Sequence, residues 1–188
     1  MEAKLNAERE HRLRIARPDD VAELQALIDT SVRALSVHFN TPQQIESALR
    51  YVFGVDTQLI ADETYYVIES GGVIVAAGGW SRRRTLFGGD QHKSADDPEL
   101  DPTREPARIR AFFVHPAFTR RGLARRLFDE CAAAARAHGF ASMQLGATLP
   151  GQPLYEALGF SAIESIEVPM PDGEVLPVVR MSRDLEIR

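Results

Sequence analysis

The residues from Val114 to Arg126 have types and spacing that could bind an anion. A predicted strand ends at Val114, and a tight turn then leads through Gly122 into the start of a long helix. Amides at a helix N-terminus lack internal partners, and with the helix dipole they present partial positive charge to a phosphate. Gly122 and Ala124 leave room for backbone to approach a ligand. The cationic side chains of the segment are Arg120, Arg121, Arg125 and Arg126. The segment therefore predicts an anion site that suits a phosphate, with a solvated basic first turn as the alternative.

The charge of the chain as a whole argues against a general nucleic-acid binder. The formal net charge is −5, whereas neutralising many phosphates needs a broad basic surface. The sequence has neither a Gly-x-x-x-x-Gly-Lys-Ser/Thr run nor a paired His or Cys signature, so we expect no nucleoside-triphosphate chemistry and no metal site. The longest apolar runs are far shorter than the roughly 20 residues that cross a bilayer, so we expect no membrane partner.

The chain is expected to form one domain over residues 1–188. Its 188 residues are 44% apolar and 26% charged, and no repeat or flexible linker divides them. Residues 1–14 lack the unbroken apolar stretch of a secretory signal, which predicts a cytoplasmic location by default. The single cysteine, Cys131, cannot form an internal disulfide, and its place on an apolar helix face predicts a buried structural thiol rather than a nucleophile.

Apolar periodicity and turn residues predict a mixed α/β fold around the anion-binding turn. Strands are expected over residues 13–16, 64–69, 73–80, 108–114, 141–146, 160–168 and 175–182. Helices are expected over residues 19–36, 41–49, 122–138 and 151–158. Residues 70–72, Ser-Gly-Gly, predict a hairpin, so the strands on either side should be antiparallel neighbours. Residues 81–106 are polar and irregular, which is typical of a long loop beside a site.

Two sequence blocks together resemble the GNAT acetyltransferase superfamily. Residues 119–124, Thr-Arg-Arg-Gly-Leu-Ala, resemble its Gln/Arg-x-x-Gly-x-Gly/Ala motif after a strand and a Val-x-Pro-type exit. Residues 153–160, Pro-Leu-Tyr-Glu-Ala-Leu-Gly-Phe, are similar to its Leu-Tyr-x-x-Leu-Gly-Phe pattern at the expected interval. Thr119 departs from the usual first motif residue, which matters little if backbone amides do most of the binding. The resemblance is strongest from Arg108 to Phe160.

The resemblance implies a mostly antiparallel mixed sheet, with helices on both faces and central strands that splay apart beside a bulge in the 108–114 strand. The pantetheine arm of acetyl-CoA would lie in that gap, and Thr148 stands where many members have an asparagine that touches it. The residues implied to contact acetyl-CoA are Phe113, Val114, Thr119, Arg120, Arg121, Gly122, Leu123, Ala124 and Arg125. The implied reaction is direct attack of a primary amine on the thioester, without a metal. Homodimers are common in the family, so a homodimer is one expected assembly.

Tyr155 matches the family tyrosine that often protonates the departing thiolate, a task suited to a phenolic hydroxyl. The alternative is a tyrosine that only packs in a short helix. The general base is not assigned. Many members place a glutamate in the strand before the turn, but here the polar positions hold Arg108 and Arg110. The candidate bases are His92, His115, Glu105 and Glu69, and each could equally be a surface residue.

The acceptor is also left open by the sequence. A small amine, an amino acid, an antibiotic, a protein N-terminus or a lysine would all fit the family reaction. Trp80 could line an acceptor pocket or pack in the core. Residues 87–105 carry six acidic side chains against Lys93 and Arg104, so this loop could attract a cationic acceptor or simply be a solvated charged loop. The alternative function is a non-catalytic module that binds or senses acyl-CoA.

Overall fold

Local capping signals explain where the helices begin and end. The computed structural model describes residues 11–185. At the start of α3 (Pro42–Tyr51), Thr41 Oγ1 accepts from the Gln44 amide at 3.1 Å and Gln44 Oε1 accepts from the Thr41 amide at 3.0 Å, which is a capping box. At the end of α5 (Leu123–Ala137), Gly139 adopts a φ of 87° and the Phe140 amide donates to the Ala135 carbonyl at 3.1 Å. Both ends agree with the sequence prediction.

The other elements follow the predicted order closely. The strands are β1 (His11–Ile15), β2 (Tyr65–Ser70), β3 (Val73–Ser81), β4 (Ala107–Val114), β5 (Ser142–Thr148), β6 (Ser161–Pro169) and β7 (Val175–Asp184). The remaining helices are η1 (Pro18–Asp20), α2 (Val21–Leu35), α4 (Thr57–Ala61), η2 (Pro116–Phe118) and α6 (Gln152–Ala157). The prediction of only two helices before the β2–β3 hairpin was wrong, because the five-residue α4 is too short to show a helical period.

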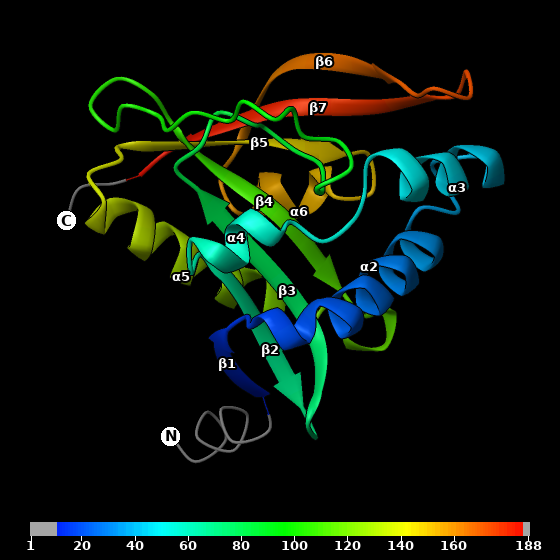
Figure 1. Ribbon diagram of the computed structural model, residues 1–188, viewed down its shortest axis with the longest axis horizontal. Coiled ribbons are helices and arrows are strands. Elements are labelled where there is room, and N and C mark those ends of the chain that lie inside the picture. Colours follow the sequence, from blue (N-terminus) through cyan, green and yellow to red (C-terminus); the bar gives the residue numbers. More distant parts are fainter. Residues whose placement is uncertain (1–10, 186–188) are drawn as a thin grey trace.

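The strands form one seven-stranded sheet in the order β1-β2-β3-β4-β5-β7-β6 (Figure 1). Every neighbouring pair is antiparallel except β4 and β5, which run parallel. Antiparallel neighbours need only short connections, whereas the parallel pair requires a crossover, which α5 supplies. The predicted mixed and mostly antiparallel sheet is confirmed.

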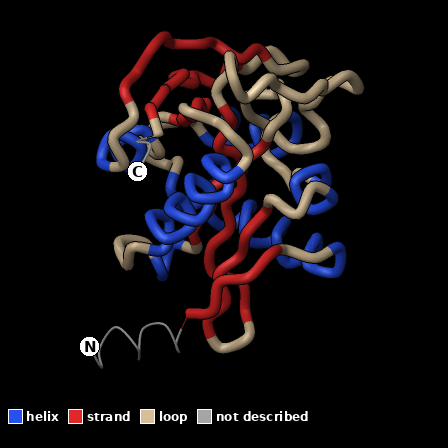
Figure 2. Tube along the Cα trace, turned by 90° about the vertical axis from the view of Figure 1, so that its left-hand side faces the viewer, coloured by secondary structure: helices blue, strands red, loops and turns tan. Residues whose placement is uncertain are grey.

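Helices cover both faces of the sheet, as predicted, so each face has its own apolar core (Figure 2). Leu127, Phe128 and Cys131 of α5 are almost fully buried in the core on one face. Leu24 and Ile28 of α2 are fully buried in the core on the other face. Within the part of the chain that the structure describes, no helix is long and apolar enough to cross a membrane. The apolar residues that recur at helical spacing in α2 and α5 thus form the faces that pack against the sheet.

A buried ion-pair network fastens the long loop after β3 to the sheet. Arg110 of β4 and Asp56 are each only 1% exposed at the side chain, and Arg110 Nη2 lies 2.7 Å from Asp56 Oδ2. The same guanidinium donates to the Thr85 carbonyl at 3.0 Å and to the Gly88 carbonyl. Lys93 forms a second ion pair with Asp56. The loop is therefore held by charges that water cannot easily reach.

We predict that Asp56→Asn lowers the free energy of unfolding by about 3–5 kcal/mol, because Arg110 and Lys93 then lose the carboxylate that compensates their buried charge. Urea unfolding of the purified protein measures the change. Glu164→Gln is the matched control, since it removes an ion pair with Arg180 whose side chains are 49% and 39% exposed. That control should lose less than about 1 kcal/mol. Equal losses in the two variants would contradict the assignment.

Candidate functional site

A bulge in β4 opens the sheet at the centre of the molecule. Along β3 the paired residues Ala77 and Gly79 are two apart, but their partners on β4, Phe113 and Arg110, are three apart. The extra residue is accommodated at Ala111, whose φ is 55°. A bulge of this kind bends its strand and disrupts the local ladder. The bulge implied by the family resemblance is therefore present.

The parallel partner of β4 separates from it at the same place. β4 pairs with β5 only at Ala107 with Met143 and at Arg108 with Gln144. Beyond these residues β5 continues to Thr148 beside β7, while β4 continues alone on this edge. A cavity of about 760 Å³ occupies the gap, and its lining includes the β4 residues 109–114 together with Gly146 and Thr148. The predicted splay of the central strands is confirmed.

The turn that enters α5 lines this cavity. Gly122 has a φ of 80°, and a Cβ placed on it would meet no atom within 4 Å. The first amide of the helix with a backbone acceptor is that of Arg126, which donates to the Gly122 carbonyl at 3.0 Å. The amides of residues 123–125 precede it and have no acceptor in the preceding turn. Residue 120 also has a positive φ, of 63°. Backbone that alternates between positive and negative φ creates concave sets of amides that bind anions. The turn therefore fits a phosphate.

The arginines of the turn differ in where their side chains lie. Arg120 and Arg125 line the cavity, and Arg125 also donates to the Ala157 carbonyl at 3.0 Å. Arg121 does not line the cavity. Its guanidinium donates to the Ala117 carbonyl at 3.1 Å and lies 4.8 Å from the centre of the Phe118 ring. Arg126 donates to the carbonyl of His11. Two of the four cations therefore face the candidate phosphate site.

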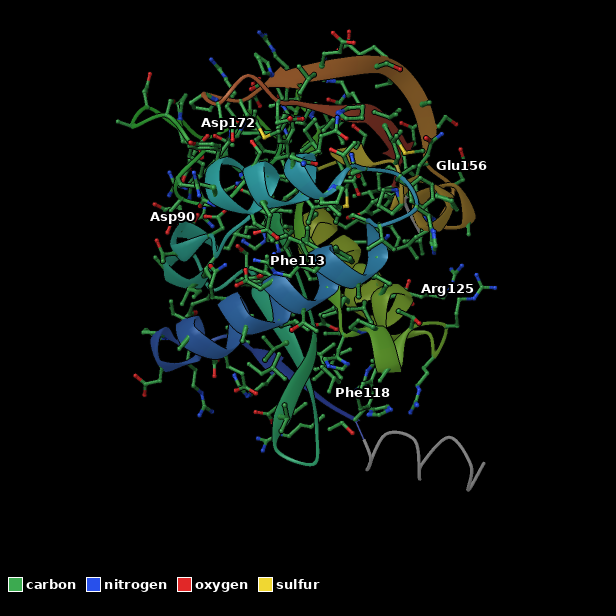
Figure 3. The ribbon with its side chains drawn as sticks, turned by 90° about the vertical axis from the view of Figure 1, so that its right-hand side faces the viewer. Asp90, Phe113, Phe118, Arg125, Glu156 and Asp172 are labelled. Atoms are coloured by element: carbon green, nitrogen blue, oxygen red, sulfur yellow. The ribbon has the colours of Figure 1, made fainter. Side chains whose placement is uncertain are left out.

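Most of the predicted site residues come together around this one cavity. The predicted residues that line it are Phe113, Val114, Thr119, Arg120, Gly122, Leu123, Ala124, Arg125 and Tyr155. The Thr119 hydroxyl donates to the Pro116 carbonyl at 3.0 Å, so this side chain closes the end of η2. Figure 3 shows Phe113 near the middle of one face, with Phe118 and Arg125 together to one side of it. Whether these residues contact a coenzyme stays a prediction.

Tyr155 is positioned by the way α6 ends. Gly159 adopts a φ of 86°, and the Phe160 amide folds back to donate to the Tyr155 carbonyl at 2.9 Å. The two rings pack with their centres 5.9 Å apart, and Phe112 lies on Tyr155 at 6.3 Å. The Leu-Gly-Phe part of the sequence block is thus a helix stop that orients the tyrosine. Burial raises the pKa of Tyr155, with a smaller contribution from Cys131, so its hydroxyl keeps its proton at neutral pH.

None of the four candidate bases lines the cavity. Glu69 forms an ion pair with Arg14 at 2.7 Å, and Glu105 accepts from the Asp101 amide at 2.9 Å. His115 Nδ1 accepts from the amide two residues further on and so caps η2. His92 stacks on Phe87, which does line the cavity, with ring centres 5.1 Å apart. The structure therefore assigns no side chain as the base.

Trp80 is a core residue and does not form an acceptor pocket. It is fully buried and packs against His138 and Phe140 with ring centres 5.0 and 6.0 Å away. The long loop is charged, but the acidic side chains of residues 87–105 do not line the cavity. Sequence reasoning missed Phe39, Phe53 and Phe87, which line the cavity from three separate segments. No local pattern marks them, because only the tertiary fold brings them together.

Sequence comparison connects this geometry to a known family. The model of the acetyltransferase (GNAT) family matches residues 25–160, which include the bulged strand, the turn and the Tyr155 block. The chain belongs to the acetyltransferase (GNAT) family. The family resemblance of the two sequence blocks is therefore confirmed. This GNAT protein is an acyltransferase. A comparison with curated proteins finds no match.

Solved structures share the fold of this GNAT chain at low sequence identity. A GCN5-related N-acetyltransferase from Rhodopseudomonas palustris is 18% identical with a TM-score of 0.67, and the alignment covers 92% of this chain and 94% of the other. The PaiA N-acetyltransferase from Thermoplasma acidophilum, solved with coenzyme A, is 10% identical with a TM-score of 0.62, and the alignment covers 93% of this chain and 98% of the other. The yncA protein from Salmonella typhimurium, solved with acetyl-CoA, is 20% identical with a TM-score of 0.61, and the alignment covers 95% of each chain. At these identities the likeness shows the fold.

We predict that Cys131 does not react with a thiol reagent such as Ellman's reagent until the protein unfolds. The side chain is fully buried, and this burial raises the pKa of the thiol well above its ordinary value, so no reactive thiolate forms at neutral pH. The absorbance of released thionitrobenzoate should rise only in denaturant, by one equivalent per chain. Rapid labelling of the folded protein would contradict this assignment and reopen covalent catalysis.

Proposed function

We propose that this protein moves the acetyl group of acetyl-CoA to a primary amine by direct attack. The observation that carries the proposal is that the amides after Gly122, the bulged strand β4 and Tyr155 all line one cavity. An anion site at one end and a proton donor further along match the two ends of a coenzyme A thioester. The two neighbouring folds solved with coenzyme A or acetyl-CoA support this choice of ligand.

The coenzyme would lie along the gap between β4 and β5. Its pyrophosphate would accept hydrogen bonds from the amides of residues 122–125 and charge from Arg120 and Arg125. Its pantetheine arm would follow the unpaired edge of β4 past Thr148, because an unpaired strand edge still offers amides and carbonyls to a ligand. The acetyl group would then reach the bulge near Phe113. Each contact is part of the proposal.

The chemistry needs few protein groups. The neutral amine forms a nitrogen–carbon bond with the thioester carbon, and amides near Phe113 and Val114 stabilise the oxyanion that results. The carbon–sulfur bond then breaks, and the Tyr155 hydroxyl gives its proton to the departing thiolate. The proton lost from the amine passes to water, and Tyr155 is reprotonated from water. No covalent acyl-enzyme forms in this sequence.

The first test is Gly122→Glu, which we expect to abolish acetyl-CoA binding as measured by isothermal titration calorimetry. The added carboxylate would occupy the space where backbone meets phosphate and would repel it. Gly122→Ala is the matched control, since any side chain at a φ of 80° carries the same backbone strain of about 1–2 kcal/mol. Ala should therefore report the effect of that strain and of a Cβ alone, and should lose less affinity than Glu. Unchanged affinity in the Glu variant would place the coenzyme elsewhere.

The second test is Tyr155→Phe, which should lower kcat in a thiol-release assay about 100-fold or more while changing the Kd for acetyl-CoA less than about threefold. Phe preserves the packing on Phe112 and Phe160. The matched control is Tyr66→Phe, a buried tyrosine of the same core that does not line the cavity. Equal activity of the Tyr155 variant and the wild type would remove the proposed role. Binding of acetyl-CoA with no thiol release from any amine would instead support the non-catalytic module.

A further inference from the structure

One part of the cavity lining, outside the turn at Gly122, consists of apolar side chains. We call it the acceptor end, and its apolar lining comprises Val32, Leu35, Phe39, Phe53, Phe87 and Phe113. Phe53 and Phe113 pack edge to face with ring centres 6.2 Å apart. Figure 3 shows Phe113 between the ribbons of α2 and α3. Four aromatic rings in one lining favour a ligand with an aromatic or branched apolar body.

No carboxylate is available to a ligand in this cavity. Among the residues that the structure describes, the charged side chains of the lining are all arginines: Arg110, Arg120 and Arg125. Two acidic groups beside Arg110 and Lys93 are already engaged, because Asp56 pairs with both cations and Asp90 accepts from the Thr57 hydroxyl at 2.6 Å. A ligand with a second positive charge would lose water here and gain no partner, which costs free energy.

The guanidinium of Arg110 lies on the cavity side of its ion pair with Asp56. Arg110 lines the cavity, whereas Asp56 does not. The wall formed by residues 87–89 carries His92 behind it, stacked on Phe87. Burial and then the Arg110 charge lower the pKa of His92, against a hydrogen bond with the Tyr51 backbone that raises it.

These features select for an amine that is already neutral. The nucleophile needs a free lone pair, and no lining side chain is a base that could take its proton. At pH 7.5 about one third of an α-amino group with a pKa near 7.8 is neutral, against about one in a thousand of a lysine-type amine with a pKa near 10.4. The titratable and charged groups around the lining are Arg110, Arg120, Arg125, Tyr155 and, behind Phe87, His92. None of them would hold an ammonium ion.

Resting on the proposed function, we propose that the acceptor is a weakly basic primary amine of the α-amino type, carried on an aromatic or branched apolar body without a second cationic group. Amino acid amides and peptide N-termini with such side chains have this chemistry. Polyamines, aminoglycosides and lysine side chains do not. The acidic side chains of the 87–105 loop do not line the cavity, so we do not expect them to hold the acceptor.

The test compares matched amines with the full chain and acetyl-CoA in a thiol-release assay. Phenylalaninamide and phenylethylamine share a ring and differ in basicity, while leucinamide and lysinamide share an α-amino group and differ in a second charge. At pH 7.5 we expect kcat/KM to be at least tenfold higher for the first member of each pair. The pH at which kcat/KM levels should also move with the basicity of the acceptor. Preference for lysinamide or spermidine would overturn the inference.

A variant tests the cause of the selectivity. Leu35 lines the acceptor end and is 38% exposed, so a charged residue there can stay hydrated and the fold should persist. Leu35→Glu should raise the ratio of kcat/KM for lysinamide over leucinamide at least threefold, and Leu35→Gln, equal in size, should leave the ratio unchanged. An unchanged ratio in the Glu variant would show that missing carboxylates do not set the selectivity.

The outcomes separate this inference from the function on which it rests. Thiol release that favours cationic acceptors contradicts only the inference. Acetyl-CoA binding with no release from any amine contradicts the proposed function, and the inference falls with it. Failure to bind acetyl-CoA at all, measured by calorimetry, contradicts the coenzyme site itself.

Discussion

The sheet cannot close between β4 and β5, and the site depends on this constraint. One extra residue at Ala111 disturbs the ladder on the β3 side, and only two residue pairs join β4 to β5. A backbone without a ladder partner still needs hydrogen bonds, so the open edge is a place for a ligand rather than a defect. The same connection that makes β5 parallel to β4 also brings the N-terminus of α5 to that opening. Strand edge and helix amides therefore face one cavity because of a single topological feature.

A charged residue is buried in the centre of the sheet beside the bulge. Ile109 packs in the core beside α5, and Ala111 and Phe113 pack in the core beside α2. The extra residue therefore leaves Arg110 and Ala111 on the same face. Arg110 then needs a buried anion, and Asp56 supplies it from the segment before α4. A buried ion pair adds little net stability, but removing one of its partners is costly. Here the pair also ties the loop that walls the acceptor end to the strand that would hold the acetyl group.

The sequence predicted most of the fold because its signals are local. The Thr41 capping box, the Gly139 stop of α5 and the apolar face with Leu127 each act within one or two turns, and all are found in the structure. The turn that enters α5 was also predicted, because its amides come from consecutive residues. The acceptor end was not predicted from the sequence, because Phe39, Phe53 and Phe87 lie on three connecting segments that only the tertiary fold brings together. Arg110 was noted as polar, but its buried partner 54 positions away gave no sequence signal.

Net charge and local charge lead to different conclusions about the acceptor. A net charge of −5 and an acidic loop would suggest a cationic partner, yet exposed charges are screened beyond roughly 8–10 Å at physiological salt. An amine bound in the cavity would contact its lining, which holds arginines and aromatic rings. The carboxylate of Asp56 is already paired with Arg110. Burial strengthens those few local charges, because water no longer screens them. The selectivity that we propose therefore depends on the charges that line the cavity rather than on the net charge of the chain.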